Sequence, residues 1–219
     1  MRSLSELIDL DDPAFPLVRD LAANAVRPVE ILPPSATRDD VLWRTQVTTR
    51  SPMGAVVYEM GGILIDGGWL RVLGSGHLRL TRTLPGWNEG RADRFLLVAD
   101  DAVGGFFAIN GGAFGPDVKS LYYFAPDSLE WEPMKIGYSD FLQWACAGKL
   151  DGFYEWIRWS GWEADAEKLH GDRCYLFSPP LFTKEGKGGS GQRGEVPVIE
   201  SWGLQMEFRK QLKSDGRSA

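Results

Sequence analysis

The feature that most constrains the fold is a run of apolar segments between residues 94 and 136 that are joined by very short loops. The segments RFLLVA, FFAI, VKSLYYFA and EWEPMKI follow one another, and the loops between them are rich in glycine, asparagine, aspartate and proline. Such loops are too short for a crossover helix, so consecutive strands must be antiparallel neighbours. The chain contains 26 glycines, whereas average usage predicts roughly 15. This excess favours many tight turns, and we predict a mainly antiparallel sheet.

The segments before and after this run predict further strands and a set of helices. The apolar runs on either side of Asp66-Gly67-Gly68 indicate two strands around a glycine turn. Residues 1–60 predict short helices separated by prolines, one of them starting at Ser51-Pro52. After the sheet, Ser139 is expected to cap a helix, and FYEWIRWSGW is expected to form a second one. The expected fold class is α+β, with a mainly antiparallel or mixed sheet flanked by helices.

The C-terminal part has a different composition. KEGKGGSGQRGE contains no apolar residue and predicts a flexible loop over 183–195, whereas the pattern of Val196–Phe208 predicts a strand and the residues from Lys210 a polar tail. We expect one α+β domain over 1–182, followed by this loop and a C-terminal extension over 196–219. Within that domain we expect a helical part over 1–60, a sheet-rich core over 61–136 and helices over 138–169.

The charge balance limits the classes of partner. Lysine and arginine total 24 against 30 acidic residues, which gives a net charge of −6. Nucleic acids and anionic membranes both require positive charge, so we expect neither as a partner; a basic protein partner stays open, as does a homo-oligomer. The first twelve residues lack an apolar targeting core, and no apolar run approaches the length of a membrane span. With two well-separated cysteines, Cys146 and Cys174, we expect free thiols in a cytoplasmic protein.

Familiar catalytic and cofactor motifs are missing from the sequence. The two histidines, His77 and His170, lie far apart, so no zinc-type spacing exists, although a site made from both and a carboxylate stays open. Ser75 stands between glycines beside His77, but the surroundings differ from a nucleophile elbow, and we expect a glycine loop after a strand. The phosphate-binding and dinucleotide-binding glycine patterns are absent too. We therefore expect no cofactor and no metal.

Carboxylates and tryptophans are the remaining candidates for a site. Asp100 and Asp101 are adjacent at a strand end, so they should point to opposite faces and satisfy turn backbone groups more readily than share a site. Trp69, Trp131, Trp144 and Trp156 are predicted to lie in the core. Three others, Trp87 in an exposed turn, Trp159 and Trp162, are candidates either for sugar platforms and interface anchors or for a roof over the edge of the core.

Several blocks of rare residues carry a resemblance to known families. GGILIDGGWLRVLGSGH, WNEG, VADDAVGGFFAINGG, YYFAPDSLEW, YSDFLQW and FYEWIRWSGWE occur in this order. Over most of residues 55–182 the chain resembles a bacterial family known only as a domain of unknown function. More distantly, residues 94–148 resemble the core of the SUKH superfamily, which the C-terminal segment 171–219 extends beyond.

The SUKH resemblance implies an α+β binding module, and many such domains are thought to be immunity proteins that neutralise bacterial toxins. The resemblance implies no catalytic residues. It places a binding cleft near the sheet-side residues around Asp100, Asp101, Asn110 and Trp131. We therefore favour a non-enzymatic protein-binding module with a basic, toxin-like partner. The alternative is a small enzyme or ligand-binding protein that acts on a polar, carbohydrate-like substrate through carboxylates and tryptophans. The candidate binding residues are Trp87, Glu89, Asp93, Asp100, Asp101, Asn110, Asp117 and Trp131.

Overall fold

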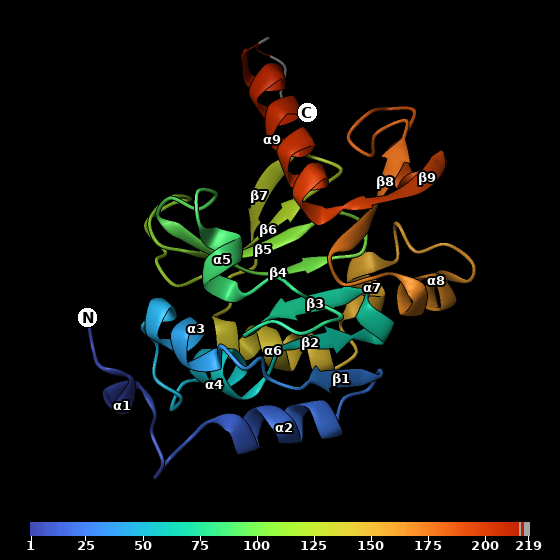
Figure 1. Ribbon diagram of the computed structural model, residues 1–219. Helices are drawn as coiled ribbons and strands as arrows, with labels where there is room; N and C mark the ends of the chain where they lie inside the picture. The colour runs from blue at the N-terminus through green and yellow to red at the C-terminus, as the bar shows by residue number, and fades with distance from the viewer. Residues whose placement is uncertain (215, 217–219) are drawn as a thin grey trace.

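The centre of the molecule is an antiparallel sheet whose strands follow one another in chain order. The computed structural model describes residues 1–214 and 216, and within them the sheet has seven strands in the order β1 to β7 (Figure 1). Every neighbouring pair is antiparallel, which confirms the predicted fold class, α+β with an antiparallel sheet flanked by helices. The strands are β1 (Val29–Leu32), β2 (Gly62–Ile65), β3 (Leu70–Leu73), β4 (Phe95–Asp101), β5 (Phe106–Asn110), β6 (Leu121–Ala125) and β7 (Glu130–Pro133).

One strand of this sheet lies in the part of the chain that the sequence predicts to be helical. β1 pairs with β2, with Val29 opposite Ile65 and Leu32 opposite Gly62. It is an edge strand of four residues between Pro28 and Pro33, and prolines are tolerated at the ends of an edge strand because no partner needs their N–H. Its short alternating pattern is too brief to separate from a loop.

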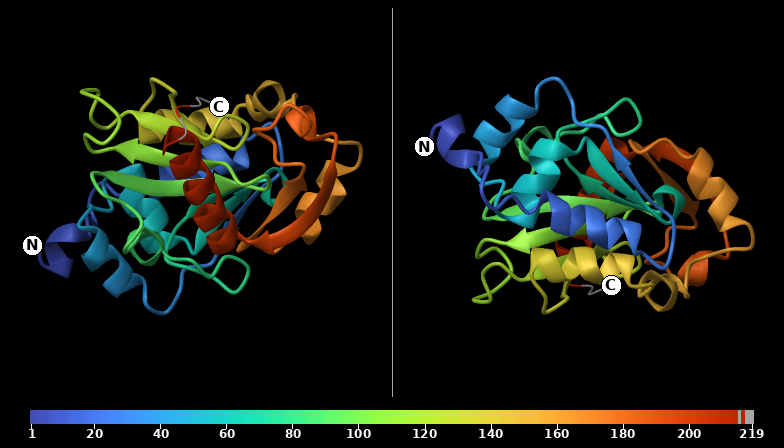
Figure 2. Two further views of the ribbon diagram at one scale, coloured as in Figure 1. Left: turned by 90° about the horizontal axis from the view of Figure 1, so that it is seen from above. Right: turned by 90° about the horizontal axis from the view of Figure 1, so that it is seen from below.

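Helices cover both faces of the sheet. In Figures 1 and 2, α2, α4 and α6 lie on one side and α5 and α9 on the other. Neighbouring residues of β5 show the same division, because Phe107 contacts Phe141 of α6 whereas Phe106 contacts Trp87 of α5 and Trp202 of α9. The helices before β4 are α1 (Leu4–Leu7), α2 (Phe15–Ala23), α3 (Arg38–Thr45), α4 (Pro52–Glu59), the short 3-10 turn η1 (Asp66–Gly68) and α5 (Leu84–Asn88).

One predicted helix start is confirmed by the structure and another is wrong. Ser51 caps α4, since its side chain accepts a hydrogen bond from the Gly54 N–H, as predicted. The predicted cap at Ser139 is wrong: Ser139 is the second residue of α6 (Tyr138–Cys146), and the cap residue is Gly137, two residues earlier. FYEWIRWSGW is not one helix either, because α7 (Leu150–Tyr154) ends inside it and α8 (Trp162–Lys168) begins after Gly161. Gly161, the residue directly before α8, has φ 83°, a left-handed conformation that favours glycine and cannot continue a helix.

The C-terminal part forms a hairpin and a long helix. β8 (Arg173–Ser178) pairs with β9 (Gln192–Pro197), and the short 3-10 turn η2 (Lys187–Gly189) lies between them. The strand predicted over Val196–Phe208 is wrong beyond Pro197, because the chain continues as helix α9 (Val198–Ser214). The buried residues of that helix recur at helical spacing: Val198, Ser201, Trp202 and Gln205. Of the predicted polar tail, residues 215 and 217–219 lie outside the described part of the chain.

Candidate functional site: a buried ion network below a hydroxyl-lined groove

A neutral network of two arginines and two aspartates joins the middle of the sheet to the surface. Arg71 of β3 lies opposite Asp100 of β4, and its Nε donates to Asp100 Oδ1 over 2.7 Å with both side chains fully buried. Arg82, in the loop before α5, pairs with Asp100 Oδ2 through Nη1 and with Asp172 Oδ1 through Nε at 2.9 Å. Two guanidinium groups and two carboxylates compensate one another, which is the condition under which charges can be buried.

Asp172 ties two loops together at the outer end of this network. It accepts hydrogen bonds from the backbone N–H of Thr81 at 3.0 Å and from the Thr81 hydroxyl at 2.5 Å. Burial alone would raise the pKa of Asp172, but the Thr81 hydrogen bonds and the Arg82 charge outweigh it and hold that pKa below its ordinary value. The loop from His77 to Thr83 is therefore fixed by a charged anchor.

This anchored loop forms one wall of a groove of about 390 Å³. The opposite wall is the loop that connects β1 to α3, and both loops leave the same end of the sheet. Pro34 and Leu78 give the rim an apolar part, and Leu78 is 86% exposed. Hydroxyl groups and one imidazole make up its polar lining, from Ser35, Thr37, Ser75, His77, Thr81 and Thr83.

Ser75 and His77 have separate structural roles in this groove. The Ser75 hydroxyl donates to the Met60 carbonyl at 2.8 Å and accepts from the Ser35 N–H at 3.0 Å, so it is held in place by backbone groups, in the glycine loop that the sequence predicts. His77 Nδ1 accepts from the Arg79 N–H, so in the neutral ring the proton lies on Nε2. Within the described part of the chain Nε2 donates to no protein atom, and His77 lines the groove, so this N–H can donate to a ligand that enters it.

The second histidine lies against the same loop. His170 Nε2 is 2.9 Å from the Leu78 carbonyl, and its Nδ1 accepts from the Asp172 N–H. The fold therefore brings both histidines to one loop, which sequence distance conceals. In the described part of the chain no three histidine, cysteine or acidic side chains are arranged to hold a metal ion.

Asp101 occupies a different environment from Asp100, on the other face of β4. Its Oδ1 accepts from the N–H groups of Val103 and Gly105, and its Oδ2 accepts from the hydroxyls of Tyr123 and Tyr154 at 2.8 and 3.0 Å. Burial raises the pKa of Asp101 although these donors oppose the shift. The two contacts to the turn confirm the predicted backbone role for Asp101. The same prediction is wrong for Asp100, whose partners are two arginine side chains. The separate partners of the two carboxylates agree with the predicted opposite faces.

Among the other candidate residues, Asn110 at the end of β5 and Asp117 in the loop after it form a structural unit. The Asn110 amide donates to the Gly115 carbonyl at 3.0 Å and to Asp117 Oδ1 at 3.1 Å. Tyr122 donates its hydroxyl to the same carboxylate. Trp131, half-buried on β7, stacks on Phe114 of this loop with ring centroids 4.5 Å apart. These three candidates lie together, at the opposite end of β5 from Asp101.

Trp87 departs from the prediction of an exposed turn. It lies in helix α5 and is buried, with the guanidinium groups of Arg82 and Arg91 4.8 and 4.6 Å from its ring. Glu89 is exposed and pairs with Arg44 at 2.9 Å, and Asp93 is exposed as well. The eight candidate residues are thus distributed over several parts of the molecule, and binding through them stays a prediction.

Trp159 and Trp162 cover the edge of the core, which was the alternative to a role as sugar platforms or interface anchors. Trp162 is buried and Trp159 half-buried, and both pack against the fully buried Trp69. Arg158 lies 3.7 Å from the centroid of the Trp162 ring and pairs with the buried Asp66. Burial raises the pKa of Asp66 against the opposing effect of Arg158.

The arginines that organise the site are not among the residues predicted from the sequence. Arg71 is the one signal that the sequence offered, because it is a charge inside the apolar run WLRVL and such a residue needs a buried partner. Arg82 and Asp172 carry no comparable signal, since both stand in polar surroundings. Among the described residues, no helix has the length and apolar character that crossing a bilayer requires.

Comparisons with known proteins identify the family. A family model described as "Protein of unknown function DUF2625" matches residues 4–201. YbfG of Escherichia coli (strain K12), described as uncharacterized, is 41% identical over 214 residues, which cover 96% of this chain and 98% of that protein. An uncharacterized protein of Haemophilus influenzae (strain ATCC 51907 / DSM 11121 / KW20 / Rd) is 38% identical over 225 residues, with 98% and 97% covered. No solved structure gives a significant match. The chain belongs to the DUF2625 family, which confirms the predicted resemblance to a bacterial family of unknown function.

Proposed function

We propose that this chain is a protein-binding module that takes a polar segment of a basic partner protein into the hydroxyl-lined groove. The groove carries this proposal, because its lining combines hydroxyl groups and the His77 imidazole with the exposed Leu78. Ser75 is buried and bonded to the backbone, but the hydroxyls of Ser35, Thr37 and Thr83 keep donor or acceptor capacity beyond their contacts within the chain. Such groups suit the alternating N–H and C=O groups of a peptide. Leu78 and Pro34 supply apolar contact on the rim, as interface anchors do.

The charge of the chain supports a basic partner. The net charge is −6, and helix α3 begins directly after Thr37 of the groove with Asp39 and Asp40 exposed in its first turn. Neither Asp39 nor Asp40 forms an ion pair with another described residue, so both charges face solvent. Exposed charge of one sign speeds the association of an oppositely charged protein, and salt weakens the effect. Neutralisation of a basic toxin, as in the superfamily that residues 94–148 resemble, is the role that we propose for this binding.

The contacts of the buried carboxylates favour binding over the alternative of a carbohydrate-acting enzyme. Such an enzyme needs two carboxyl groups that converge on one pocket with their pKa values pushed apart. Asp100 is neutralised by Arg71 and Arg82, and Asp101 faces two tyrosines on the other side of the strand. Neither residue lines the groove.

Site-specific photo-crosslinking in the organism that encodes the chain tests the proposal. A photoreactive amino acid replaces Leu78 on the groove rim or, as a matched control, Val118, another exposed aliphatic residue in a loop. We expect one basic protein to be cross-linked from position 78 and not from position 118. Equal cross-linking from both positions would overturn the proposal.

Affinity measurements with that purified partner complete the test. We expect Leu78→Glu to weaken binding by about tenfold or more, because it places a charge on the apolar rim, and Val118→Glu to leave binding within about twofold. The affinity of the wild-type chain should fall as salt rises. A partner that binds L78E and wild type equally would show that the groove is not the interface.

A further inference from the structure

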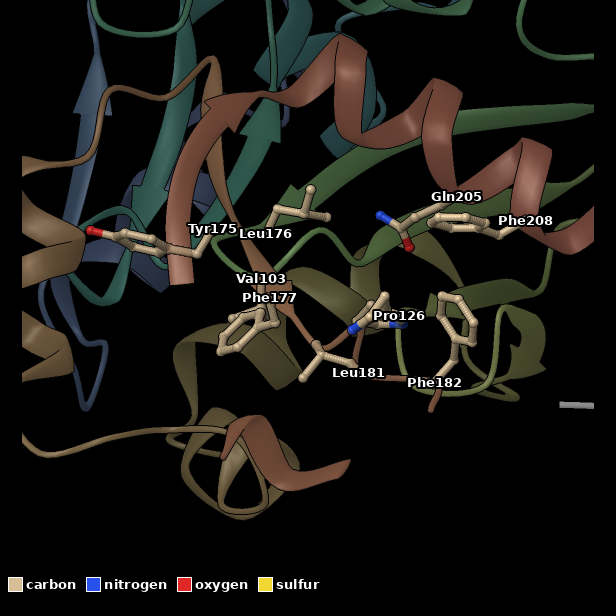
Figure 3. Close-up of a pocket in the computed structure, with 10 residues that line it drawn as sticks. Val103, Pro126, Tyr175, Leu176, Phe177, Leu181, Phe182, Gln205 and Phe208 are labelled. Atoms are coloured by element: carbon tan, nitrogen blue, oxygen red, sulfur yellow. The ribbon is translucent and has the colours of Figure 1, made fainter. Parts of the chain in front are cut away.

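A second and separate hollow lies between helix α9 and strand β8 with the segment that follows it. Its walls are nearly all apolar, and they include Val103, Pro126, Leu181, Phe182 and Phe208 (Figure 3). The rings of Phe182 and Phe208 have their centroids 5.2 Å apart. The hollow and its open mouth together hold about 310 Å³ of empty space, but a water-sized sphere can be centred in only about 20 Å³ of it. This narrow slot has the proportions of a flat group.

One buried polar atom points into this slot without a partner. Gln205 of α9 is 5% exposed, and its amide nitrogen donates to the Gly104 carbonyl at 2.8 Å and contacts the Ser201 hydroxyl at 2.9 Å. These contacts fix the orientation of the amide, because the Gly104 carbonyl can only accept. The opposite atom, Oε1, is buried and has no hydrogen-bond partner among the described residues. Figure 3 shows it directed toward the space between Phe208, Phe182 and Pro126.

A buried acceptor without a partner has lost its hydrogen bonds to water and gained none in return, so a ligand that supplies a donor is bound more tightly than one that does not. A water molecule against Oε1 would find few other polar atoms on these apolar walls, whereas buried waters make about three hydrogen bonds. A planar apolar group with a single N–H or O–H would fill the narrow apolar space and also supply a donor to Oε1.

We propose that the slot binds an aromatic ring that carries one hydrogen-bond donor, such as an indole or a phenol, with the donor on Gln205 Oε1. Phe182 and Phe208 contact the ring, and Val103 and Leu181 close the end of the slot. This site shares no lining residue with the groove and does not depend on the proposed protein partner.

The test compares indole with benzothiophene, which has the same shape but no N–H. Each is titrated at millimolar concentrations into the full chain with labelled methyl groups, and the shifts of the Val103 and Leu181 methyls are followed by NMR. We expect indole to bind about tenfold more tightly, the ratio that one neutral hydrogen bond accounts for. The Leu78 methyls in the groove should not move. Equal affinities, or no shift of the slot methyls with either compound, would overturn the proposal.

Two variants separate the acceptor from the fold around it. Gln205→Met keeps the length of the side chain and removes Oε1, and we expect it to bind indole and benzothiophene equally. Ser201→Ala removes one contact of the amide and keeps Oε1, so it should retain the preference for indole. If Q205M keeps that preference, the donor does not bind at Gln205.

N-acetyltryptophanamide distinguishes two sources of the ring. It presents the same indole on a peptide backbone. Tighter binding than indole would identify an aromatic side chain of a protein as the occupant, and weaker binding would identify a free small molecule.

Discussion

Asp100 and Asp101 are adjacent in the chain, yet they have opposite electrostatic surroundings. Asp100 lies between two guanidinium groups, and Asp101 accepts four hydrogen bonds from neutral donors. Removing one member of a buried ion network leaves a charge unpaired, whereas a carboxylate held by neutral donors can be replaced by an amide. The two positions therefore predict different outcomes for the same aspartate-to-asparagine change.

At Asp101 the change should alter the pH dependence of stability. Its pKa in the folded state is raised, so the folded state binds the proton more tightly than the unfolded state does. The stability that comes from this proton is complete below the unfolded pKa of about 3.9, and it is lost as pH rises through the folded pKa. Asp101→Asn removes this loss. The free energy of unfolding of the wild type, measured in urea from pH 4 to 8, should fall relative to D101N as pH rises; a constant difference would contradict this.

At Asp100 the same change should destabilise the fold at every pH near neutrality. Asp100→Asn leaves Arg71 and Arg82 with only Asp172 to balance them, and we expect a loss of about 3–5 kcal/mol in the free energy of unfolding. Urea unfolding at pH 7 measures it. Asp93→Asn is the matched control on an exposed residue and should stay within about 0.5 kcal/mol of wild type. A similarly small effect of D100N would mean that the network contributes little.

The two cysteines should be poor nucleophiles in the folded protein. Burial raises the pKa of Cys174 to about 11, and burial also raises the pKa of Cys146. At pH 7 the thiolate fraction of Cys174 is then on the order of 300-fold smaller than that of a free cysteine with a pKa near 8.5. In a Cys146→Ser variant, reaction with a thiol reagent should be slow in buffer and fast in denaturant. Fast labelling of the folded variant would show that Cys174 is accessible.

At the scale of elements, local sequence patterns predicted the strands correctly where the apolar runs were long or were joined by a recognisable turn. β4 to β7 combine apolar runs with short loops, which leave only antiparallel pairing. The pattern failed where tertiary contacts decide the outcome. β1 exists because β2 pairs with it, and Arg71 finds Asp100 only through the register of β3 and β4, two strands that are more than twenty residues apart. No local rule in the sequence specifies that register, so the ion network could not be predicted.

Helix α9 attaches to the sheet through one aromatic side chain in particular. Trp202 is 8% exposed and meets Phe106 of β5 edge to face, with ring centroids 4.9 Å apart. We expect Trp202→Ala to cost about 3–5 kcal/mol, because it removes a large buried side chain. Leu204→Ala in the same helix, at a residue 37% exposed, should cost much less. Urea unfolding of both variants measures the difference, and equal costs would show that α9 does not rely on Trp202.

At the scale of the whole molecule, the C-terminal hairpin and helix share contacts with the seven-stranded sheet. The Tyr175 N–H donates to the Ala102 carbonyl at 2.7 Å, and Gln205 donates to the Gly104 carbonyl. Arg82 and Asp172 join the loop before α5 to the start of β8. Buried residues of β8 and α9 belong to the same apolar cluster as those of the sheet. The division into a domain over 1–182 and a C-terminal extension stays a prediction, and these contacts indicate how to test it.

We expect the chain to unfold in one cooperative transition, because separating the hairpin and α9 from the sheet would expose Trp202 and unpair Asp172 from Arg82. Far-UV circular dichroism reports all helices and strands, whereas fluorescence of an acrylodan label on a Leu204→Cys variant, in which Cys146 and Cys174 are replaced by serine, reports α9 alone. Coincident urea midpoints would show that the C-terminal part is integral to the fold. An earlier midpoint for the label would show that α9 detaches first, and the slot around Gln205 would then exist only while the helix is docked.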